Sequence, residues 1–237
     1  MNYTLKKIQA AENWKELSPF LFFYRKISVI FTWFLLKAKF TPNKISALSV
    51  IFGIFAATGF ATGEKETIFL GGIMSQIYMI LDCTDGYIAR VKKICTKFGA
   101  VYDVVKDVFV NNVVLLGIGI GLYIQTQRLE ILLIPFLALF GMNMTVVTHN
   151  TQMMVFRDEP LRDSSVMKEL GSRKKFLREI MIKSALSGSF QYFIIGIGAF
   201  IDKLLWSTVI LAIFQNIYWI SLVFLIYISN RNQRIRK

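Results

Sequence analysis

Six long stretches of the chain carry no charged side chain, and this feature limits the possible folds more than any other. A transmembrane helix needs roughly 20 consecutive apolar residues to cross the hydrocarbon core of a bilayer. Most of the six stretches approach or exceed this length, and the shortest can continue as a helix through Asp82 toward Arg90. The stretches are 45–63, 67–81, 108–127, 131–156, 184–201 and 204–230. We therefore expect an all-α, polytopic membrane protein with six transmembrane helices.

The composition argues against a soluble domain. The 237 residues are 54% hydrophobic, with 21 phenylalanines and a mean hydropathy of +0.50. Charged residues make up only 18% of the chain, whereas about 25% is usual in soluble proteins.

The net charge of +13 follows the membrane topology. Of the 28 lysines and arginines, 25 fall on one side of the six predicted spans, and only Lys65, Arg128 and Lys203 fall on the other. Because cytoplasmic loops are enriched in Lys and Arg, both termini are predicted to be cytoplasmic, in a cell membrane. The basic residues would meet lipid headgroups, so no nucleic-acid partner is expected.

The chain divides into three parts. Residues 1–40 form a predicted cytoplasmic and interfacial segment, residues 41–230 the six-helix transmembrane domain, and residues 231–237 a basic cytoplasmic tail. Within the first part, residues 20–37 are rich in aromatic side chains but carry Arg25 and Lys26. This pattern favours a helix lying in the membrane interface, and an additional transmembrane helix is the alternative.

Four aspartates lie between the second and third spans, in two pairs at helical spacing. Asp82 and Asp85 share one helix face, as do Asp103 and Asp107 on the next helix. Four adjacent carboxylates cannot all stay ionised without a cation. Because the ligands would all be oxygens, Mg²⁺ or Mn²⁺ is favoured over zinc, and four carboxylates suffice for two ions.

The aspartates belong to a longer pattern, D-x2-D-G-x2-A-R-x8-G-x3-D-x3-D, which runs from Asp82 to Asp107. Arg90 could contact phosphate oxygens, and Gly86 and Gly99 leave the backbone open to a ligand. With eight fixed positions, a chance match at one starting residue is on the order of 10⁻⁹ or rarer. The pattern therefore predicts a metal and phosphate site.

This pattern resembles the signature of the CDP-alcohol phosphatidyltransferases, integral membrane enzymes of phospholipid biosynthesis. Thr41-Pro42-Asn43 and the six spans resemble that family as well. The resemblance implies transfer of a phosphatidyl group from a CDP-alcohol, such as CDP-diacylglycerol, to the hydroxyl of a second alcohol, with release of CMP. It further implies a catalytic domain at the cytoplasmic face and a homodimer.

The resemblance also implies roles for particular residues. Asp82, Asp85 and Asp103 would hold two Mg²⁺ or Mn²⁺ ions, and Asp107 would be the general base and a possible ligand of the second ion. The cytidine diphosphate would contact a set of residues around this motif: Asn43, Gly86, Arg90, Thr96 and Gly99.

The acceptor alcohol stays open. Residues 71–90 resemble the inositol-phosphate and aminoalcohol branches of the family, although Tyr87 replaces an acidic residue that is common there. The basic segment 157–183 suits a phosphorylated acceptor, with Arg157, Arg173 and Lys174 as candidate contacts. A polar CDP-alcohol donor is a further alternative within the family. Outside it, the alternatives are a membrane transporter with a cation pathway and an inactive scaffold.

Overall fold

A computed structural model of the chain describes residues 4–12, 14, 17–155 and 188–235, and the regular elements in these residues are all helices. The all-α class predicted from the sequence is therefore confirmed. The elements are α1 (Leu5–Gln9), α2 (Pro19–Lys37), α3 (Pro42–Ala61), α4 (Lys65–Lys92), α5 (Lys97–Thr126), the short 3₁₀ helix η2 (Leu129–Leu132), α6 (Leu133–Val155), α9 (Gly188–Phe200) and α10 (Leu204–Ile235).

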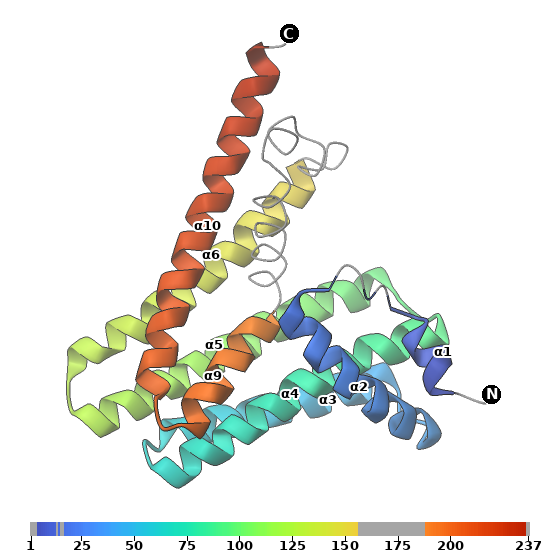
Figure 1. The fold of residues 1–237 in the computed structure, drawn as a ribbon, viewed down its shortest axis with the longest axis horizontal. Helices are drawn as coiled ribbons and strands as arrows, with labels where there is room; N and C mark the ends of the chain where they lie inside the picture. The colour runs from blue at the N-terminus through green and yellow to red at the C-terminus, as the bar shows by residue number, and fades with distance from the viewer. Residues whose placement is uncertain (1–3, 13, 15–16, 156–187, 236–237) are drawn as a thin grey trace.

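Among the described residues, six helices are long and apolar enough to cross a membrane, which is the predicted number. The set differs from the expected one in two members. Helix α2 qualifies by length and composition, whereas the described part of α9 has only 13 residues. Residues 184–187, which the expected fifth span includes, lie outside the described residues. In Figure 1, α2 crosses α4; its placement in the interface stays a prediction.

Helices α3, α4 and α5 approach one another closely because glycines lie where their backbones meet. A Cβ atom on Gly117 or Gly121 of α5 would overlap a backbone carbonyl of α3, at Ala57 and Phe60 respectively. On the other side of α3, a Cβ on Gly59 would lie 3.0 Å from the Cα atom of Gly71 in α4. Small residues permit such packing in membranes. Helix α3 thereby fixes α4 and α5 relative to each other.

The turn between α4 and α5 brings the two aspartate pairs to the same end of the bundle. Helix α4 ends in a left-handed residue, Lys93 (φ 57°), and the Ile94 N–H donates to the Ala89 carbonyl at 3.0 Å. Helix α5 begins after Thr96, whose hydroxyl accepts a hydrogen bond from the Gly99 N–H at 2.9 Å. Both are ordinary ways to end and start a helix.

The remaining helices pack beside this group. Figure 1 shows α6 and α10 running side by side, at an angle to α3, α4 and α5, with α9 beside α4. A cavity lies among α4, α5, α6, α9 and α10, and polar side chains form part of its lining.

The close contact between α5 and α3 can be tested with Gly117→Val. The added side chain must displace the Ala57 carbonyl, so we expect a loss of roughly 1–3 kcal/mol of stability. That loss lowers the melting temperature of the detergent-solubilised protein by about 2–4 °C per kcal/mol. Leu116→Val is the matched control, because Leu116 is 58% exposed on the outer face of α5. Equal melting temperatures for the two variants would contradict the packing described.

Candidate active site

Three carboxylates from two helices converge at the α4–α5 end of the bundle. Asp82 and Asp85 come from α4 and Asp103 from α5, and one oxygen of each lies within 4.8 Å of the other two. Asp85 is buried, and the Ser46 hydroxyl of α3 donates to its Oδ2 at 2.5 Å. The predicted gathering of these acids is therefore present. Their oxygen-only donor set fits Mg²⁺ or Mn²⁺.

Asp107, the fourth acid, lies beside this group. It is absent from the set of three oxygens, and its Oδ1 accepts a hydrogen bond from the Tyr78 hydroxyl at 3.0 Å. One turn of α5 separates it from Asp103, so the two carboxylates share a helix face, but the hydrogen bond from Tyr78 goes to Asp107. The geometry thus separates three candidate metal ligands from a fourth carboxylate held by a tyrosine.

A lysine, Lys106, lies among the four carboxylates. This position of the lysine was not predicted from the sequence. The Lys106 ammonium donates to Asp82 Oδ1 at 2.5 Å, to Asp85 Oδ2 at 3.1 Å and to Asp103 Oδ1 at 2.9 Å. Its distance to Asp107 Oδ1 is 3.7 Å, and its side chain is only 1% exposed. A cation in this position offsets the mutual repulsion of the carboxylates.

All five residues predicted to contact cytidine diphosphate line one cavity of about 660 Å³. A Cβ on Gly86 would lie 3.3 Å from the Arg90 guanidinium, so the glycine leaves that side chain its place. Asp85 and Asp103 lie in the wall of this cavity. Its lining consists of Thr41, Pro42, Asn43, Ser46, Asp85, Gly86, Ala89, Arg90, Ile94, Cys95, Thr96, Phe98, Gly99, Ala100, Tyr102 and Asp103.

The N-terminal segment fixes the arginine of the motif. Glu12 Oε2 accepts hydrogen bonds from Arg90 Nη2 at 3.0 Å and from Arg25 Nη1 at 2.7 Å. Both guanidinium groups lie about 5 Å from the centre of the Tyr87 ring, at 5.0 Å for Arg90 and 5.2 Å for Arg25. Sequence analysis missed the roles of Glu12 and Arg25, because Glu12 contacts Arg90 from far along the chain and Arg25 joins them through its own hydrogen bond to Glu12.

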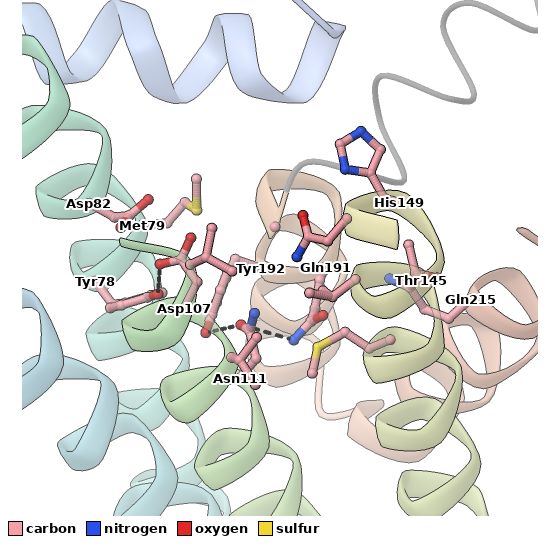
Figure 2. Close-up of a pocket in the computed structure, with 16 residues that line it drawn as sticks. Tyr78, Met79, Asp82, Asp107, Asn111, Thr145, His149, Gln191, Tyr192 and Gln215 are labelled. Carbon is pink, nitrogen blue, oxygen red and sulfur yellow. Dashed lines mark hydrogen bonds between the residues drawn. The ribbon is translucent and has the colours of Figure 1, made fainter. Parts of the chain in front are cut away.

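A second, smaller cavity has a volume of about 200 Å³ (Figure 2). Asp82 and Asp107 lie in its wall. Figure 2 shows Asn111 bonded to two residues of α9: its Oδ1 accepts from the Tyr192 hydroxyl at 2.6 Å and from Gln191 Nε2 at 3.4 Å. The remaining polar lining comes from α6 and α10 and consists of Thr145, His149, Asn150 and Gln215. Hydroxyls and amides make up most of the polar groups, and apolar side chains such as Met79, Val104 and Met142 complete the lining.

The three residues proposed to contact the acceptor, Arg157, Arg173 and Lys174, lie outside the described residues. The segment that contains them connects α6 to α9, and both helices line the second cavity.

Comparison with known proteins decides the family. The model of the CDP-alcohol phosphatidyltransferase family matches residues 39–227. The chain belongs to this family. Membership favours the predicted transferase over the transporter and scaffold alternatives.

Two curated relatives carry inositol-related names. The chain is 33% identical to a bifunctional IPC transferase and DIPP synthase of Aquifex aeolicus over 68% of its own length, and 34% identical to a phosphatidylinositol phosphate synthase of Mycobacteroides abscessus over 35%. The matches cover only 36% and 37% of those relatives' own lengths.

Solved structures share the fold at low sequence identity. The phosphatidylinositol phosphate synthase of Mycobacterium tuberculosis with CDP-DAG bound is 17% identical, with a TM-score of 0.58 over 85% of this chain and 94% of that one. Its complex with manganese and citrate gives 16% identity and a TM-score of 0.56 over 84% and 88%. These similarities support the arrangement of helices.

The contact between Glu12 and Arg90 predicts a stability effect. Glu12→Gln removes the charge that two largely buried guanidinium groups share, so we expect a loss of about 1–3 kcal/mol. The melting temperature of the purified protein, compared with that of wild type, measures it. Glu66→Gln is the control, because Glu66 is exposed in the first turn of α4 and should change stability by less than about 0.5 kcal/mol. Equal melting temperatures for Glu12→Gln and Glu66→Gln would indicate that Glu12 does not hold Arg90 in place.

Proposed function

We propose that the chain transfers a phosphatidyl group from a CDP-alcohol to the hydroxyl of a second alcohol and releases CMP. One observation carries the proposal: the four carboxylates lie in the wall between two cavities. Asp85 and Asp103 border the first cavity, and Asp82 and Asp107 border the second. A donor in one cavity and an acceptor in the other would meet at the carboxylates, as a group transfer requires.

The first cavity is the proposed donor site. The donor's diphosphate would lie near Arg90 and the carboxylates, and its cytidine would lie nearer Asn43 and Thr96 at the outer part of the lining. CDP-diacylglycerol is the donor we favour, because the solved structure of similar fold holds CDP-DAG. Membrane lipid surrounding the helices would accommodate its acyl chains.

Asp82, Asp85 and Asp103 are the proposed ligands of Mg²⁺ or Mn²⁺, with room for two ions if Asp107 contributes. The donor set fits such ions, and a protein of the same fold has been solved with manganese. Bound there, the ions would neutralise the diphosphate and the departing CMP.

Asp107 is the proposed general base. Its carboxylate borders the second cavity, and Tyr78 orients it through a hydrogen bond to Oδ1. Asp107 would take the proton of the acceptor hydroxyl as that oxygen bonds to the β-phosphorus. The bond between this phosphorus and the oxygen bridging to the α-phosphate breaks, and CMP leaves with the bridging oxygen.

The second cavity favours an inositol-type acceptor. Hydroxyl and amide groups can both donate to and accept from the several hydroxyls of a polyol. The names of the two curated relatives point the same way. Where the acceptor carries a phosphate, the basic segment that follows α6 would bind it, with Arg157, Arg173 and Lys174 as the proposed contacts.

The cellular setting is also a proposal. The asymmetry of Lys and Arg residues favours a location of both termini and the active site at the cytoplasmic face of the cell membrane, where CDP-linked substrates are available. The homodimer implied by the family stays a prediction.

A CMP-release assay in membranes tests the function. With CDP-diacylglycerol and Mg²⁺ or Mn²⁺, we expect CMP release that requires an inositol-type acceptor, with myo-inositol phosphate, myo-inositol, glycerol phosphate and serine as the panel. Asp107→Asn should lower the rate by about 10²–10⁴-fold, the range typical for loss of a general base.

Asp202→Asn is the matched control, because Asp202 lies in the α9–α10 turn and pairs there with Lys65. Its rate should stay within about twofold of wild type. Full activity in Asp107→Asn would remove Asp107 as the base. Release with serine or glycerol phosphate alone would overturn the acceptor assignment, and no release from any donor–acceptor pair would overturn the proposed reaction.

A further inference from the structure

Lys106 is a buried charged residue for which the proposed reaction supplies no role. It lies on α5 one residue before Asp107, at one of the variable positions of the eight-position pattern. Its side chain is 1% exposed, and burying an ammonium group is unfavourable unless it is paired on several sides. Four carboxylates supply that pairing.

The ammonium contacts one oxygen of each of the three carboxylates that form the candidate metal group. Asp82 Oδ1, Asp85 Oδ2 and Asp103 Oδ1 lie 2.5, 3.1 and 2.9 Å from Lys106 Nζ. Mg²⁺ binds oxygens at roughly 2.0–2.1 Å. Two cations cannot share this set of oxygens without strong repulsion. Binding of an ion there and the present position of Lys106 therefore exclude each other.

Within the described residues, the ion pairs of the four aspartates all involve Lys106. Lys92, a lysine on α4, donates to the Phe40 carbonyl at 2.9 Å and forms none of these ion pairs. Lys106 is thus the positive charge that balances the carboxylates in this arrangement. Its flexible four-carbon stem allows the ammonium to move while the helix stays in place.

We propose that Lys106 is an internal cation of the metal centre: it holds the carboxylates together and yields the oxygens of Asp82, Asp85 and Asp103 when a divalent ion binds. The inference rests on the metal centre of the proposed function. After the exchange, Asp107 is the carboxylate left to pair with Lys106, since it lies outside the three-oxygen group. The carboxylates are therefore already gathered before metal binds. Displacing the lysine costs free energy, which lowers the affinity for the metal ion.

The test is Mn²⁺ binding to the full chain, purified in detergent and stripped with EDTA, by isothermal titration calorimetry. Lys106→Met removes the competing charge and keeps most of the side-chain volume, so we expect Mn²⁺ to bind at least about tenfold more tightly than to wild type. Lys92→Met is the matched control and should bind Mn²⁺ like wild type.

Thermal unfolding provides a second readout that does not depend on metal affinity. In EDTA, Lys106→Met leaves the carboxylates without their cation, so its melting temperature should fall by about 5 °C or more below wild type, and saturating Mn²⁺ should close the gap. If the methionine variant does not fold, Lys106→Gln carries both measurements, because its amide can still donate hydrogen bonds to the carboxylates.

The possible results distinguish failure of the role proposed for Lys106 from failure of the proposed metal centre. Equal or weaker Mn²⁺ binding by the Lys106 variants, with clear binding by wild type, overturns the role of Lys106 and leaves the metal centre standing. An unchanged melting temperature in EDTA overturns the claim that Lys106 holds the carboxylates together. Absence of Mn²⁺ binding in wild type and variants overturns the metal centre and the inference together.

Discussion

The crowding of four carboxylates at the ends of two apolar helices is the constraint on which the rest of the structure depends. Asp82 and Asp85 lie within 4.8 Å of Asp103, and such a cluster is unstable without positive charge nearby. Lys106 provides that charge in the structure. Glycines on α3, α4 and α5 let α3 pack closely against both α4 and α5, and this packing holds the two helices in the register that brings the carboxylates together. Close backbone packing and electrostatic balance are thus two parts of one arrangement.

The same cluster divides the interior into two chemically different spaces. The first cavity is bordered by the motif arginine and by the start of α3, which suits a nucleotide diphosphate. The second is bordered by hydroxyl and amide side chains from α5, α6, α9 and α10, which suits an alcohol with several hydroxyls (Figure 2). Reactants of a phosphatidyl transfer differ in this way, so the division of space accords with the family to which the chain belongs.

The sequence predicted what depends on local periodicity. Helical spacing placed each aspartate pair on one face, and the short apolar run 67–81 predicted that the helix continues past Asp82, as α4 does. It could not predict contacts between distant segments, such as Glu12 with Arg90, since neither side chain marks its partner.

Two further features were beyond sequence periodicity. Lys106 looked like one more cytoplasmic cation, because a lysine in a variable motif position gives no sign of burial. The second cavity collects polar residues from five separate helices, and most of them taken alone resemble ordinary interhelical hydrogen-bonding groups. For α2 and α9, length and composition do not separate spanning from interfacial helices, so the expected and observed sets of spans differ.

A crystal structure with Mn²⁺ and CDP-diacylglycerol would show directly whether donor and metal meet at these carboxylates. Data collected at the manganese absorption edge should show anomalous density within about 2.2 Å of oxygens from Asp82, Asp85 and Asp103. Cytidine density should fill the cavity beside Asn43 and Arg90, with the Lys106 ammonium moved away from the metal. Manganese bound elsewhere would contradict the proposed metal ligands. Nucleotide bound in the cavity lined by Gln191 and Tyr192 would contradict the proposed donor site.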